Sequence, residues 1–145
     1  MDLDAGFRIG ELGYLNRLKG ELNIYHLEHV RDEKEAKNAN LAEKEKLYKL
    51  GFHWSKCNLR KREDNPHIDE NVLEGLQPHR YLKSLTIADF GGGKFPSWML
   101  AGCIRNDLVF DNLIEINLQF CRKCEEVPTL GHLPCLKVLK IIGLG

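Results

Sequence analysis

One short pattern of apolar residues recurs along the chain and constrains its fold more than any other feature. An apolar residue is followed by two variable residues, a second apolar residue, one variable residue and a third apolar residue, as in Leu47–Phe52 (LYKLGF). The same spacing occurs in LKSLTI from Leu82, LIEINL from Leu113 and LKVLKI from Leu136. A weaker copy, KGELNI, begins with Lys19 where the others have leucine. Four complete copies are difficult to obtain by chance, so the pattern indicates an internal repeat.

The spacing within each copy is that of a short β-strand. Alternate side chains of a strand point to opposite faces, so the last two apolar residues of a copy share one face. One such unit cannot bury its narrow apolar face alone. Units stacked side by side form a continuous core and pair their strands into a parallel sheet. The pattern predicts parallel strands near residues 21–25, 49–53, 84–88, 115–119 and 138–142.

The spacing between copies is uneven. Their central apolar residues are 28, 35, 31 and 23 residues apart, which overlaps and exceeds the roughly 20–29 residues of leucine-rich repeats. We therefore predict an α/β fold, an irregular leucine-rich-repeat solenoid with a parallel β-sheet on the concave face and helices and loops on the convex side. Residues 1–145 then form a single domain of about five repeats. The central residues are Leu22, Leu50, Leu85, Ile116 and Leu139.

Two segments between the predicted strands favour helices. Residues Arg31–Lys49 are rich in Ala, Glu, Lys and Leu, which are strong helix formers, and they contain the favourable pair Glu33–Lys37. Their apolar stripe is thin, which is typical of a solvated helix on the convex side of a solenoid. A shorter helix is predicted over Asp69–Leu76, with Asp69 as its N-cap and Pro78 just beyond its end.

Composition sets limits on function. Lysine plus arginine and aspartate plus glutamate number 21 each, so there is no electrostatic reason to expect nucleic acid or an anionic membrane as partner. No apolar run approaches the roughly 18 residues of a membrane span, and the N-terminus lacks the basic and apolar segments of a signal peptide. Five cysteines without an export signal favour free thiols in a reducing compartment. We therefore expect the chain to be cytoplasmic.

No residue pattern points to catalysis. The segment GGGK from Gly91 differs from a phosphate-binding loop, which needs a glycine in place of Ala88 and a serine or threonine in place of Phe95. The histidines, among them His26 and His29, are scattered and do not lie with a carboxylate and a nucleophile at a spacing that indicates a triad. We expect no enzyme activity, no catalytic residue, no cofactor and no small-molecule substrate.

One group of cysteines and a histidine allows two interpretations. Cys121, Cys124, His132 and Cys135 have the paired short spacings of a tetrahedral zinc site. Alternatively, Cys121 lies three residues after Leu118, where leucine-rich repeats often place Asn or Cys at the turn that follows the strand. We favour this structural role and assign no metal ligand. A zinc-binding structural module stays as an alternative function.

Several longer segments resemble one protein family. GELNIYHLEHV, EAKNANLAEKEKLYKLGFHW, VLEGLQPHRYLKSLTI, FPSWM and CRKCEEVPTLGHLPCLKVLKIIG follow one another between about Gly10 and Gly145. They are similar to the leucine-rich-repeat region of plant nucleotide-binding leucine-rich-repeat (NBS-LRR) disease resistance proteins of the coiled-coil class. The resemblance implies a fragment of a larger innate immune receptor that acts in defence through protein recognition or autoinhibition. A truncated, non-functional receptor fragment is a second alternative.

The strand residues that alternate with core positions are predicted to form a binding face. Their mixed polarity suits a protein partner, and the resemblance implies that this partner is a pathogen effector or the nucleotide-binding ATPase domain of the same receptor. Charge reversals at Glu115 and Lys140 are expected to alter partner binding without unfolding the chain. The predicted protein-binding residues are Glu21, Asn23, Tyr25, Lys49, His53, Ser84, Thr86, Glu115, Asn117, Gln119 and Lys140.

Overall fold

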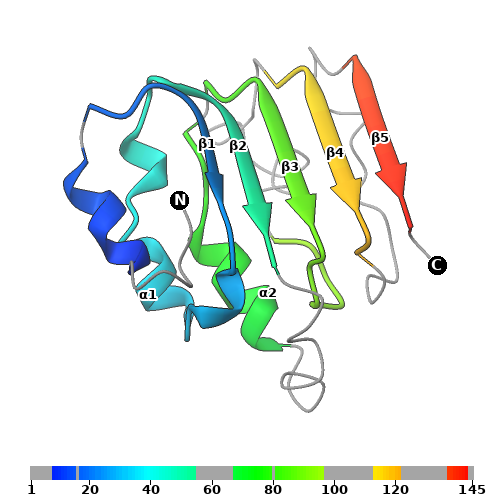
Figure 1. Cartoon of the computed structure of the whole chain (residues 1–145), viewed down its shortest axis with the longest axis horizontal. Coiled ribbons are helices and arrows are strands. Elements are labelled where there is room, and N and C mark those ends of the chain that lie inside the picture. The colour runs from blue at the N-terminus through cyan, green and yellow to red at the C-terminus, as the bar shows by residue number, and fades with distance from the viewer. Residues whose placement is uncertain are drawn as a thin grey trace, which may run out of the picture.

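The computed structural model describes residues 8–15, 17–54, 67–79, 81–96, 113–121 and 137–143. Five strands lie side by side in one sheet, in the order in which they occur along the chain (Figure 1). Each strand is parallel to its neighbours, so the predicted parallel sheet is confirmed. The strands are β1 (Gly20–Ile24), β2 (Leu47–His53), β3 (Ser84–Ala88), β4 (Glu115–Gln119) and β5 (Val138–Ile142).

The register of the sheet aligns the repeated apolar residues in two rows that face the core. A residue in one row is flanked by the equivalent residue of each neighbouring strand, so every repeat covers the apolar side of the next. Leu50, Leu85 and Ile116 are each 1% exposed as a result. The first row is Leu22, Leu50, Leu85, Ile116 and Leu139, and the second is Ile24, Phe52, Ile87, Leu118 and Ile141.

Two helices lie together beside the first strands of the sheet (Figure 1). They are α1 (Glu33–Lys37) and α2 (His67–Gly75). Ala36 of α1 and Leu73 of α2 are fully buried, and they belong to the same cluster of buried residues as the core-facing side chains of β2. No helix in the described part of the chain is both long enough and apolar enough to cross a membrane.

The prediction of one long helix over Arg31–Lys49 is wrong. The helical segment α1 is short, a 3-10 turn follows at Leu41–Glu43, and β2 already begins at Leu47. Asn40 has a left-handed backbone with a φ of 52°, which a right-handed helix cannot contain. Tertiary packing therefore overrides the helix propensity of this segment, because the bend brings the buried Leu41 and Leu47 to the core.

The short second helix is confirmed, with a different start. It begins at His67, two residues before the predicted N-cap Asp69, and ends at Gly75. Asp69 therefore lies in the first turn of the helix, where it is buried. A carboxylate in this position is favourable because the first turn is the positive end of the helix dipole.

The chain turns in the same way at the end of four of the five strands. His26, Asp89, Phe120 and Gly143 have φ values of 63°, 60°, 55° and 71°, and each lies two residues after the last core-facing residue of its strand. The backbone N–H groups of Asp89 and Phe120 donate to carbonyl oxygens of the next strand, at 2.8 and 2.7 Å. These four strands therefore end in the same way, at a residue with a left-handed backbone.

Candidate protein-binding face

The strand side chains that point away from the core form three rows across the sheet, which we call the outward face. All of the predicted protein-binding residues lie on this side. It also contains Gly51, Ala88, Val138 and Ile142, which had not been predicted although the strand register places them there. The rows are Glu21, Lys49, Ser84, Glu115 and Val138, then Asn23, Gly51, Thr86, Asn117 and Lys140, and finally Tyr25, His53, Ala88, Gln119 and Ile142.

Five side chains on β1 and β2 are joined in one polar network. Glu21 Oε1 lies 3.7 Å from Lys49 Nζ and accepts a hydrogen bond from Asn23 Nδ2 at 3.1 Å. Asn23 Oδ1 lies 3.1 Å from His53 Nε2. The ring of His53 is in turn stacked on Tyr25, with 4.5 Å between the ring centroids and 19° between the planes. This part of the outward face is therefore held in a defined arrangement by contacts between strands.

Gly51 provides the space that this network needs. A Cβ atom at residue 51 would overlap the side-chain oxygen of Asn23, and it would lie 2.7 Å from His53 Nε2. The side chain of Asn23 therefore lies over the backbone of β2 at Gly51, and its amide oxygen contacts His53. Burial lowers the pKa of His53 below its usual value, so the ring is neutral at pH 7. The amide oxygen of Asn23 can only accept, so the contact requires the tautomer with its hydrogen on Nε2.

The other end of the outward face carries a second charge pair. Lys140 Nζ of β5 lies 3.9 Å from Glu115 Oε1 of β4. Both side chains are exposed enough to meet solvent or a partner, so the pair is weak in the isolated chain. The outward face therefore carries one glutamate–lysine pair on β1 and β2 and another on β4 and β5, and neither sign of charge dominates it.

Cys121 has the surroundings of a structural residue. It is fully buried, and its Sγ donates to the carbonyl oxygens of Ile87 at 3.7 Å and Gln119 at 3.6 Å. Burial raises the pKa of this thiol to about 11, so it is protonated at neutral pH and can act as a hydrogen-bond donor. These contacts agree with the interpretation of Cys121 as a cap of backbone groups. The remaining candidate zinc ligands, Cys124, His132 and Cys135, lie outside the described residues.

Curated relatives of the chain are plant disease resistance proteins. Over 143 residues the chain is 38% identical to putative disease resistance RPP13-like protein 1 of Arabidopsis thaliana, and the match covers 96% of the chain. Over 140 residues it is 40% identical to disease resistance protein RGA2 of Solanum bulbocastanum, covering 94% of the chain. The chain spans 13% of the length of each of these relatives. No solved structure matches the chain significantly.

A family model covers nearly all of the chain. Residues 9–144 match the family described as R13L1/DRL21 LRRs, where LRR stands for leucine-rich repeat. The match includes all five strands and both helices of the structure, and it agrees with the stacked apolar rows of the sheet. The chain therefore belongs to the R13L1/DRL21 family of leucine-rich repeats, and it is a relative of plant disease resistance proteins.

Proposed function

We propose that the outward face binds another protein and serves as a recognition surface within a plant immune receptor. The single observation that carries this proposal is the set of polar rows on five aligned strands, which lie opposite the core. In this proposal residues 1–145 act as one recognition domain of a larger cytoplasmic protein. The chain recognises rather than catalyses, and its partner is a pathogen effector or the receptor's own ATPase domain.

The chemistry of the outward face favours a protein over the other partner classes. Tyr25 is 42% exposed although its ring is stacked on His53, so it offers aromatic contact area at a small entropic cost. Aromatic side chains of this kind often contribute most of the binding energy of protein interfaces. Nucleic acid and anionic membranes require a basic surface, whereas Lys49 and Lys140 are each paired with a glutamate.

The experiment that tests this proposal compares two double charge reversals. The first, Lys49→Glu with Lys140→Glu, changes one position on β2 and one on β5 of the outward face. The second, Lys34→Glu with Lys37→Glu, makes the same change in net charge on the exposed surface of α1. Each tagged chain is expressed in plant leaf tissue, and the proteins that co-purify are quantified by mass spectrometry, with circular dichroism as the check on folding.

We expect the reversal on the outward face to lose specific proteins that the original chain and the α1 variant both retain. The physical reason is that a partner complementary to the two lysines carries acidic groups opposite them. The new glutamates repel these groups, which weakens binding. The proposal is wrong if both folded variants retain the same proteins as the original chain. It is also wrong if only the α1 variant loses them.

A further inference from the structure

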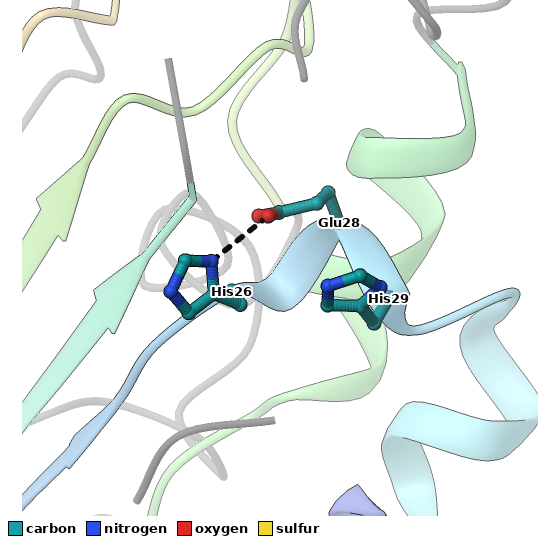
Figure 2. Close-up of side chains that lie close together, drawn as sticks. All are labelled: His26, Glu28 and His29. Atoms are coloured by element: carbon teal, nitrogen blue, oxygen red, sulfur yellow. Dashed lines mark hydrogen bonds and ion pairs between the residues drawn. The ribbon is translucent and has the colours of Figure 1, made fainter. Parts of the chain in front are cut away.

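A cluster of two histidines and a glutamate lies directly after β1, outside the polar network of the outward face. Figure 2 shows Glu28 reaching across the turn toward His26, with His29 on the same turn. His26 Nδ1 lies 3.1 Å from Glu28 Oε2. One ligand atom from each of the three side chains falls within 4.8 Å of the others. These are two imidazole nitrogens and a carboxylate oxygen, which are common ligands of zinc.

The backbone brings these three side chains together. His26 has the left-handed conformation that ends four of the strands, and a 3-10 turn, Leu27–His29, follows at once. The N–H of His29 donates to the carbonyl oxygen of His26 at 3.1 Å. Leu27 and Val30 are buried in the core, so they fix the turn on both sides of Glu28. The cluster therefore depends on a well-anchored segment rather than on chance contacts between exposed side chains.

We propose that His26, Glu28 and His29 bind a divalent transition metal ion, with Zn²⁺ as the preferred ion. Two nitrogens and one oxygen make a set of three protein ligands that leaves a fourth position for water. The side chain of Glu28 is 6% exposed, whereas that of His26 is 32% exposed and His29 is exposed. The site is thus closed on the side of Glu28 and open to solvent on the side of His29.

The geometry needs only a small adjustment to hold the ion. Two ligand atoms that are each about 2.1 Å from a tetrahedral zinc lie about 3.4 Å apart. The contact between His26 and Glu28 already has nearly this length. The three ligand atoms lie within 4.8 Å of one another, and the exposed ring of His29 is the one with the most freedom to close the remaining gap. The ring of His29 also lies close to that of His26, with 6.1 Å between the ring centroids and 45° between the planes.

The test is a titration of the metal-free 145-residue chain with Zn²⁺ in the presence of a competing chelator, followed by a thermal melt. We expect one equivalent to bind and Tm to rise with the zinc concentration. Changing one ligand, by His29→Gln or Glu28→Gln, should weaken binding at least about tenfold, since even residues behind the ligands matter by 10- to 100-fold. His79→Gln is the matched control, because this half-buried histidine lies outside the cluster.

Co²⁺ identifies the ligands independently. We expect visible absorption of a nitrogen and oxygen site, without the thiolate-to-cobalt charge-transfer band that a cysteine site gives. The proposal is overturned if Zn²⁺ does not bind, or if it raises Tm equally in the original chain and in His29→Gln. It is also overturned if a thiolate band appears that disappears in Cys124→Ser with Cys135→Ser and persists in His29→Gln, because the metal then belongs to the cysteines.

Discussion

At the scale of single residues, a position without a side chain organises the outward face. Gly51 lies in the middle row of the outward face, between Asn23 and Thr86. Its bare backbone lets the amide of Asn23 reach His53 across β2. Glycine normally weakens a strand because it has no side chain to pack and loses more conformational entropy. Here the close approach of Asn23 gives the glycine a specific role, which the strand pattern alone did not reveal.

Replacement of this glycine tests its role. Gly51→Ala should lower the free energy of unfolding by about 1–3 kcal/mol, because the new methyl group displaces Asn23 and breaks its bond to His53. Denaturant unfolding measures the loss. In an Asn23→Ala background the same substitution should cost less, because the side chain that it would strike is absent. Equal costs in the two backgrounds would show that Asn23 does not lie over residue 51.

The pKa of His53 predicts how stability depends on pH. Because burial lowers this pKa, the folded chain binds fewer protons than the unfolded chain between the lowered value and about 6.5. The free energy of unfolding should therefore fall as the pH drops through that window, and the contribution of His53 should be fully present above about pH 6.5. Urea unfolding of the original chain and of His53→Gln measures the difference. The variant should lose less stability on acidification, and equal losses would assign the effect to other groups.

At the scale of elements, the strands could be predicted from the sequence and one helix could not. Each strand is specified by a local alternation of apolar residues, and the predicted bounds of β3, β4 and β5 agree with the structure. The residues after α1 have good helix propensity but bend at Asn40, because Leu41 must reach a core formed by distant segments. Propensity is a local quantity, so it could not detect this competition.

Helices α1 and α2 pack closely at Gly75. A Cβ atom on Gly75 of α2 would lie 2.8 Å from the Cβ of Ala36 in α1 and would press on the carbonyl oxygen of Glu33. Gly75→Ala should therefore lower the free energy of unfolding by about 1–3 kcal/mol, although alanine has the higher helix propensity. Gly10→Ala is the control, since its nearest neighbour would be at 3.6 Å. Thermal melts distinguish the two, and a stabilised Gly75→Ala would contradict the close packing.

At the scale of the whole molecule, the two ends of the sheet differ. Beside β1, Ile9 and Leu12 of the 3-10 turn Ile9–Tyr14 are buried in the common core. In β5, by contrast, the core-row residues Leu139 and Ile141 are 45% and 40% exposed. Among the described residues, β5 is also a strand at the edge of the sheet. The stability of the chain should therefore decrease from the centre of the sheet toward β5.

Hydrogen exchange measures this gradient. We expect the ladder amides of β5 to exchange at least about tenfold faster than those of β3, because few buried contacts oppose local opening at the edge. Only amides that donate a hydrogen bond to a neighbouring strand are compared. The N–H groups of β3 and β5 are then matched in hydrogen bonding and differ only in how easily each strand opens. Equal protection of β3 and β5 would mean that the sheet opens only as a unit.

The candidate sites were predictable to different degrees. The members of the outward face follow from strand alternation, because a register set by the apolar rows also fixes the opposite side. The contacts among Asn23, His53 and Tyr25 depend on rotamers and on the space above Gly51, which no local pattern encodes. The histidines of the proposed metal site looked scattered, because the left-handed turn at His26 that gathers them was not predicted.

The two sides of the sheet are specified by different residues: the aliphatic rows maintain the fold, and the outward rows set the chemistry of the exposed surface. Each strand contributes one residue to every row, at the regular strand spacing of about 4.8 Å, so the outward face is a grid of positions that do not pack into the core. Under the proposed function, single substitutions on this face can change which protein is bound, while the aliphatic rows on the other side preserve the fold. Residue 51 is the exception, because any side chain there disturbs its neighbours. If this face is the recognition surface that we propose, relatives with new partners should differ at the positions around residue 51 and keep glycine at residue 51 itself.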